Sequence, residues 1–137
     1  GMRPGGLLAV VEMDALPRFL PEDIGIGRPG LERRCHEVLA RARWNAVPDW
    51  GPRLEEAGFR PAGQRRFGVE ARPAPPGTGR WADHWLRRAL PVLAGRLDAD
   101  DLLALEHLLT EDSPGAVLHR EDLVLRAGRI VWAAHRA

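Results

Sequence analysis

The chain has no lysine and only one cysteine, Cys35. All 20 basic residues are therefore arginine, and with abundant alanine, glycine, proline and leucine this composition indicates a bacterial genome rich in G and C. A single cysteine excludes a disulfide within the chain. The longest apolar run falls far short of the ~20 residues that a membrane helix needs. Met2 is not followed by a signal peptide, so we expect a cytoplasmic protein.

The chain is also poor in the groups that several kinds of function require. Ser113 is the only serine and lies in a predicted turn, so no Ser-His-Asp triad is expected. His36, His107, His119 and His135 are scattered, without a pair at i and i+4 or matching cysteines, so no metal site is expected. The net charge of +1 gives no electrostatic reason to expect a nucleic acid or an anionic membrane as partner.

The remaining pattern predicts one α/β domain over residues 1–137. A chain of 137 residues is long enough to bury most of one core. Apolar runs and alternation predict strands, 3–4 spacing predicts helices, and segments rich in proline and glycine predict loops at residues 16–30 and 73–79. The predicted strands are Leu7–Met13, Arg60–Arg72, Leu123–Leu125 and Arg129–His135, and the predicted helices are Leu31–Trp44, Asp49–Phe59, Gly79–Leu97 and Ala99–Leu109.

The first predicted strand, Leu7–Met13, carries the first candidate site. Its unbroken apolar run after a Pro-Gly-Gly turn is typical of a strand buried on both faces. Glu12 and Asp14 lie at its carboxyl end, which in an open parallel sheet faces the ligand crevice. They could hydrogen-bond a substrate or act as a base. The alternative is that two polar residues simply end a buried strand.

A second candidate site lies on the predicted helix Gly79–Leu97. Trp81, His84, Trp85 and Arg88 follow 3–4 spacing and so share one face. They could line an aromatic pocket for an apolar substrate, with His84 as a proton acceptor. The alternative, which this spacing favours, is a core stripe with His84 at its border. Cys35 lies on the apolar stripe of its own helix and is expected to be a buried, inert thiol.

Three separated segments resemble the end of one enzyme family, in the family's order. They are Arg3-Pro4-Gly5-Gly6 with the strand Leu7–Glu12, the segment Trp50–Phe59 with the strand that follows it to Arg72, and the final strand Leu123–Arg136. The sequence resembles the fifth, sixth and last strands of class I S-adenosylmethionine-dependent methyltransferases. The predicted helices over residues 79–110 resemble the insertion that many small-molecule methyltransferases carry between their last two strands.

This resemblance implies a particular sheet and a particular limit on activity. It implies a truncated sheet of about three strands with several helices, in which the last strand is antiparallel and lies between the other two. It also implies that this chain lacks the N-terminal, cofactor-binding half of the enzyme. Gly25–Gly30 follows a loop rich in proline, where the family has a glycine-rich turn after its first strand. We therefore expect no catalytic or cofactor-binding residue here and no methyl transfer by this chain alone.

The alternative function is a non-catalytic binding or interaction module. If the first strand forms one border of the sheet, its unpaired apolar edge invites association. Such a module would dimerise, complete the sheet of a partner, or bind an apolar small molecule near Trp81 and Trp85. The expected partner is a second copy of the chain, joined through the first strand or through exchanged elements.

Overall fold

The computed structural model describes residues 5–12, 16–46 and 49–136. Its internal contacts divide the chain into two compact units. The sheet unit comprises Gly1–Leu16, Asn45–Gly68 and Ala127–Ala137, and the helical unit comprises Pro17–Trp44 and Val69–Arg126. The expectation of a single domain stays a prediction.

The strands form a three-stranded antiparallel sheet in the order β1-β3-β2. Its members are β1 (Leu7–Glu12), β2 (Phe59–Ala71) and β3 (Leu125–Arg136). The register of β1 on β3 runs from Leu7 opposite His135 to Glu12 opposite Ile130. The prediction of a sheet of three strands, with the last one antiparallel between the others, is confirmed. β3 runs unbroken through residues 127 and 128, where the sequence predicted two separate segments.

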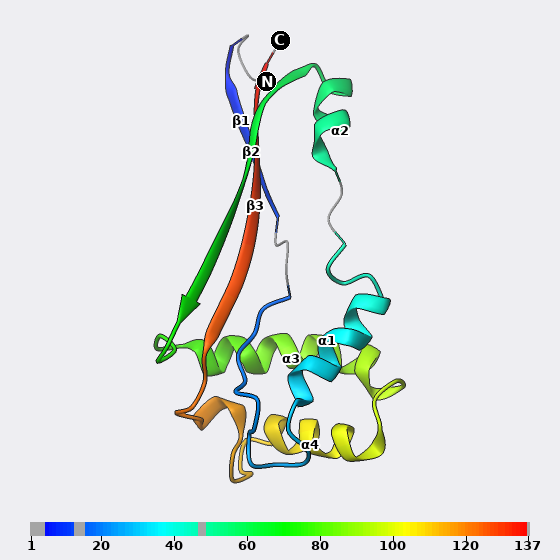
Figure 1. Ribbon diagram of the computed structural model, residues 1–137, viewed down its shortest axis with the longest axis vertical. Coiled ribbons are helices and arrows are strands. Elements are labelled where there is room, and N and C mark those ends of the chain that lie inside the picture. Colours follow the sequence, from blue (N-terminus) through cyan, green and yellow to red (C-terminus); the bar gives the residue numbers. More distant parts are fainter. Residues whose placement is uncertain (1–4, 13–15, 47–48, 137) are drawn as a thin grey trace. The chain divides into compact units, whose positions relative to one another are not determined.

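One face of the sheet unit carries its hydrophobic core. Ile130, Trp132 and Ala134 of β3 are buried together with Leu54 of α2 (Trp50–Glu56), which lies beside the strands (Figure 1). Leu8, Val10, Trp50 and Phe59 pack against this cluster. The helix predicted over Asp49–Phe59 is α2, and its ends are marked by the Asp49 side chain, which accepts a hydrogen bond from the Gly51 N–H, and by Gly58, which has a φ of 89°.

The prediction that β1 is buried on both faces is wrong. Leu7 is 62% exposed and Val11 is 57% exposed, whereas Leu8 and Val10 pack against the core. The reason is that the α2 cluster covers one face, and among the described residues of the sheet unit no second helix covers the other. β1 therefore presents an apolar face, and at one border of the sheet its backbone edge has no partner strand among the described residues.

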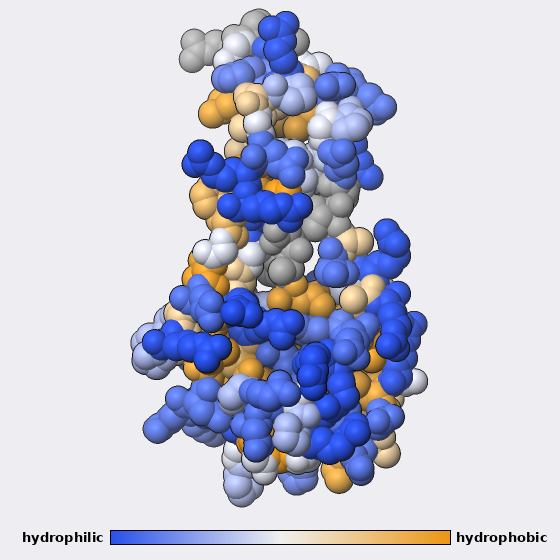
Figure 2. Space-filling view, in the orientation of Figure 1, coloured by the Kyte–Doolittle hydropathy of each residue, from blue (hydrophilic) through white to orange (hydrophobic). Residues whose placement is uncertain are grey.

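The helical unit is built around α3 (Thr78–Ala94), which contacts α1 (Leu31–Arg41), α4 (Ala99–Leu109) and the 3₁₀ turn η1 (Val117–His119) (Figure 1). Pro91 lies inside α3, and the helix continues past it to Ala94. On the face seen in Figure 2, hydrophilic side chains cover most of this unit, with small apolar patches between them. No helix in the described part of the chain combines the length and apolar character needed to cross a membrane.

The loop before α1 is tied to α4 by a charged network centred on Asp101. The Asp101 side chain is 2% exposed and accepts two hydrogen bonds from the Arg34 guanidinium, at 2.7 Å from Nε and 2.9 Å from Nη2. Arg28 donates to the same carboxylate at 3.1 Å. Asp98 lies at the N-cap of α4, but its side chain accepts a hydrogen bond from Arg28 and does not cap the helix.

We expect Asp101→Asn to lower the free energy of unfolding by about 3 kcal/mol, because the neutral amide leaves the partly buried Arg34 guanidinium without its counter-charge. Asp98→Asn is the matched control. The Asp98 side chain is 74% exposed, so losing its ion pair with Arg28 costs about 1 kcal/mol or less. Urea denaturation of both variants and the wild type provides the comparison. Equal stabilities for the two variants would contradict the structural role assigned to Asp101.

Candidate functional site

The predicted aromatic face on α3 exists, but its two tryptophans have separate packing partners. Trp81 contacts Phe19 edge to face, with ring centroids 5.2 Å apart. Trp85 contacts Trp44 in the same way at 5.6 Å, and the Arg88 guanidinium lies 6.0 Å from the Trp44 ring centroid. These contacts correspond to the packing interpretation of the stripe, and they occupy the rings with protein partners.

His84 and Glu12 are placed, whereas Asp14 lies outside the described residues. His84 is exposed on α3. Glu12 ends β1, half-buried and opposite Ile130. The crevice expected beyond this end rests on a rule for parallel strands, and the strand paired with β1 is antiparallel. The proposed substrate-binding role of Glu12, Asp14, Trp81, His84 and Trp85 stays a prediction.

The structure reveals a different candidate around Glu32, in the first turn of α1. Glu32 is only 7% exposed. Its Oε2 accepts hydrogen bonds from the backbone N–H of Phe19 at 2.9 Å and of Leu20 at 3.3 Å. The carboxylate therefore ties the loop that precedes α1 to the helix itself.

Glu32 also lines a pocket of about 280 Å³ within the helical unit. The apolar lining comes from the loop before α1 and from the segment that enters β3. Charged side chains of both signs complete it. The lining residues are Arg18, Leu20, Pro21, Glu22, Glu32, Glu70, Arg72, Val124, Leu125 and Arg126.

The rim of this pocket is held together by backbone pairing and by ion pairs. Arg18 and Arg126 exchange backbone hydrogen bonds at 2.8 and 3.0 Å. The Arg126 guanidinium pairs with Glu70 at 3.2 Å, and Arg72 lies 3.5 Å from the same carboxylate. Because these three rim side chains are about half exposed or more, their charges are partly screened by water.

Burial makes the Glu32 carboxyl a weaker acid than an exposed glutamate. Desolvation raises the pKa of its carboxyl to about 7, against the lowering effect of the two backbone hydrogen bonds and of the Arg18 guanidinium. A carboxyl that titrates near neutral pH can give up or accept a proton under cellular conditions. A buried ionisable group with a perturbed pKa in a cleft is a candidate for a functional site.

Burial also shifts the pKa values of two other side chains on α1, His36 and Cys35. Burial lowers the pKa of His36 to about 4, and the Arg18 guanidinium lowers it further, while the Pro17 carbonyl accepts a hydrogen bond from the ring at 3.1 Å. Burial raises the pKa of the Cys35 thiol to about 12, and Cys35 is 2% exposed. The expected buried position of Cys35 is confirmed, and its thiol stays protonated near neutral pH.

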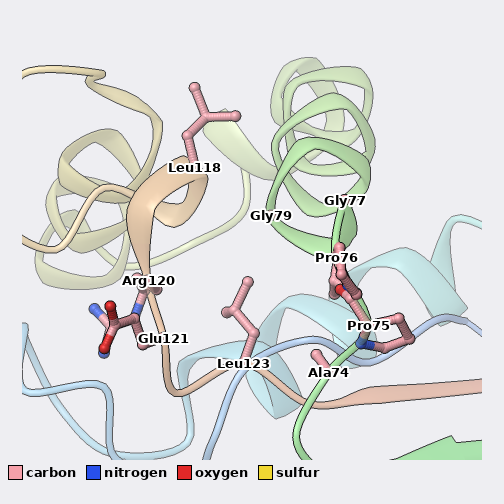
Figure 3. Close-up of a pocket in the computed structure, with 10 residues that line it drawn as sticks. Ala74, Pro75, Pro76, Gly77, Gly79, Leu118, Arg120, Glu121 and Leu123 are labelled. Carbon is pink, nitrogen blue, oxygen red and sulfur yellow. The ribbon is translucent and has the colours of Figure 1, made fainter.

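A second pocket of about 280 Å³ lies at the start of α3. Figure 3 shows Leu118, Arg120, Glu121 and Leu123 on one side of it, and the turn leading into α3 on the other. The Arg120 guanidinium is engaged with Asp122 at 2.7 Å and with the carbonyl oxygen of Ile24 at 2.8 Å. Arg120, in the charged wall of this pocket, therefore links two loops through its hydrogen bonds.

Sequence reasoning missed Glu32 because nothing in the pattern distinguishes it. It stands in the first turn of an amphipathic helix, where an acidic residue is usually solvated and favourable to the helix dipole. Its burial comes from the loop 17–24, which folds over that turn with Phe19 and Leu20 inward. The one available signal was the presence of large apolar residues in a loop that otherwise reads as solvent-exposed.

We expect Glu32→Gln to remove the Glu32 contribution to the pH dependence of stability. The folded-state pKa lies above the ordinary value of 4.5, so the stability linked to protonated Glu32 is fully present below pH 4.5 and is lost as the pH rises through about 7. This loss amounts to about 3 kcal/mol in the wild type and is absent from the variant. His36 acts with the opposite sign over an overlapping range, so the quantity to measure is the difference between variant and wild type.

Chemical denaturation at intervals between pH 4 and 8 measures this difference. Glu37→Gln is the control, because Glu37 is an exposed glutamate on the same helix. A Glu32→Gln profile parallel to that of the wild type would rule out the titration of Glu32 near pH 7.

We expect Gly79→Ala to destabilise the helical unit by about 1–3 kcal/mol. A Cβ at residue 79 would lie 2.8 Å from the Val117 carbonyl oxygen, so α3 and η1 would have to move apart. Gly95→Ala is the control at the other end of α3, because a Cβ there meets no atom within 4 Å. Thermal unfolding of both variants checks this, and similar losses at the two positions would contradict the close approach of α3 to η1.

Neither a metal site among the described residues nor a related protein helps to assign a function. Within residues 5–12, 16–46 and 49–136, no three His, Cys, Asp or Glu side chains gather as a metal site requires. Comparison of the chain with protein-family models, with curated proteins and with solved structures found no match. The resemblance to methyltransferases is therefore carried by the quoted sequence segments and stays an expectation.

Proposed function

We propose that this chain is the substrate-side portion of a small-molecule methyltransferase-like fold and that it does not transfer methyl groups by itself. The observation that carries the proposal is the strand order β1-β3-β2, with the last strand antiparallel to β1 and central. The resemblance of the sequence to the methyltransferase family implies the same order. Three strands can be ordered in few ways, so the agreement supports the proposal without being specific to one family.

The inactivity follows from what methyl transfer requires. The methyl group passes from the cofactor's sulfonium to a nucleophile by in-line displacement, so both must be held in one geometry. The family holds S-adenosylmethionine with a glycine-rich turn and an acidic residue in its first strands, and this sequence has no counterpart of that turn. The chain contributes groups suited to the substrate side. Among them are Glu32, which can accept a proton near neutral pH, and the apolar and charged residues of its pocket.

Isothermal titration calorimetry of the chain with S-adenosylmethionine tests this proposal. We expect no binding with a Kd below about 1 mM. An active class I methyltransferase titrated in the same buffer is the positive control. Tight binding, with a Kd of about 10 μM or lower, would overturn the assignment to the substrate side alone.

A second candidate function is a non-catalytic interaction module. The observation that favours it is the border strand β1, which carries exposed apolar side chains at Leu7 and Val11 and no proline or lysine along its length. Natural proteins usually protect such borders with charge, proline or a covering element. This candidate needs no methyl donor, and its specific form depends on what pairs with β1.

A further inference from the structure

We propose that β1 pairs with β1 of a second copy of this chain, antiparallel and centred on Ala9, so that two sheets join into one. This gives the interaction module a defined partner, and it stands apart from the methyltransferase-like proposal. The proposal uses residues of the sheet unit only. It rests on the direction of the backbone groups, on the side-chain pattern and on the distribution of charge along β1.

The first step is the direction of the backbone groups. Arg136 donates its N–H to the Gly6 carbonyl at 2.9 Å, and the Arg136 carbonyl accepts from the Gly5 N–H at 3.1 Å, so Gly6 and Arg136 stand at a hydrogen-bonded position of the ladder between β1 and β3. In an antiparallel ladder such pairs alternate with pairs that do not exchange hydrogen bonds. Leu8 and Val10 are therefore bonded to β3, and Leu7, Ala9 and Val11 direct their N–H and C=O groups away from β3.

The second step is the register that these outward groups allow. A copy related by a two-fold axis presents the same outward groups, so its pairing with β1 is self-complementary. With Ala9 opposite Ala9 of the second copy, Leu7 lies opposite Val11 and Val11 opposite Leu7. Each of these three pairs has outward groups on both members and exchanges two hydrogen bonds. A register shifted by two residues in either direction leaves only two such pairs within Leu7–Glu12.

The third step is the match of side chains and charge. Leu7, Ala9 and Val11 share the exposed face, so this register places Leu7 beside Val11 of the other copy on a continuous apolar surface. Leu8 and Val10 meet on the face that carries the core. Glu12 lies opposite Gly6, so no like charges face each other across the axis. A second copy of the chain therefore provides hydrogen-bond partners for the outward N–H and C=O groups of β1 without placing like charges opposite each other.

The test measures mass by light scattering after size exclusion at 10–200 μM. We expect the wild type to elute as a dimer with twice the 15.2 kDa mass of one chain. The double variant Leu7→Lys/Val11→Lys places lysine opposite lysine at two positions, and we expect its dimer to be more than about tenfold weaker. Leu7→Glu/Val11→Glu has the same effect. Mixing the two double variants pairs lysine with glutamate at both positions and restores a dimer.

Two controls separate this pairing from other kinds of association. Phe67→Lys/Val69→Lys changes β2 residues that are 48% and 54% exposed, and it should leave the dimer intact. In the Ala9→Cys variant, the new thiol lies on the two-fold axis, and Cys35 is buried, so mild oxidation should yield a covalent dimer. Circular dichroism confirms that each variant remains folded.

Three results would overturn the inference: a wild type that is monomeric at every concentration, a dimer that survives Leu7→Lys/Val11→Lys, or a mixture of oppositely charged variants that stays monomeric. A dimer lost with the β2 control but kept with the β1 variants would place the interface on the other border of the sheet, and it too would overturn the pairing through β1. None of these results bears on cofactor binding, which the calorimetry measures independently.

Discussion

The pairing of β1 with β3 is the constraint on which the sheet unit depends. β1 has no other hydrogen-bonded neighbour in the described structure, and its register on β3 decides which of its side chains meet Ile130, Trp132 and Ala134. A slip of one residue would turn Leu8 and Val10 to the exposed face and Leu7 and Val11 to the core. Since both faces of β1 are apolar, the side chains of β3 and α2 must specify this register.

The helical unit depends instead on two buried carboxylates, Asp101 and Glu32, whose pKa values are shifted in opposite directions. Asp101 receives a bidentate hydrogen bond from Arg34, and this hydrogen bond holds the pKa of the carboxyl below its usual range despite burial. Glu32 receives backbone N–H groups, and the one cation that acts on it, Arg18, is exposed; desolvation therefore dominates, and the pKa rises. The two sites differ in the partner supplied to each carboxylate, so one is fixed as an anion and the other is free to titrate.

The sequence predicted the elements better than it predicted their surroundings. The helices around Cys35 and Leu105 follow from 3–4 spacing, and the ends of α2 follow from Asp49 and Gly58, because these signals are local. The strand order came from the resemblance to a family, since no local pattern specifies which strand lies in the middle. The apolar run of β1 could not reveal that one face stays uncovered, because coverage depends on elements far along the chain.

The same limit applies to the candidate sites. The spacing of Trp81 and Trp85 placed them on one helix face, but their ring partners Phe19 and Trp44 come from the loop before α1 and the segment after it. Glu32 became visible only through the loop that covers it. A pocket whose walls come from four separate segments leaves no signature in any one of them.

The chain contains five tryptophans and no tyrosine, so its intrinsic fluorescence arises from indole rings alone. Trp50 and Trp132 belong to the sheet unit, and Trp44, Trp81 and Trp85 belong to the helical unit. Replacing the first two with phenylalanine leaves an emission spectrum that reports on the helices only. Because the rings divide between the units in this way, replacing the tryptophans of one unit allows the unfolding of the other to be followed by light emission, with no extrinsic dye.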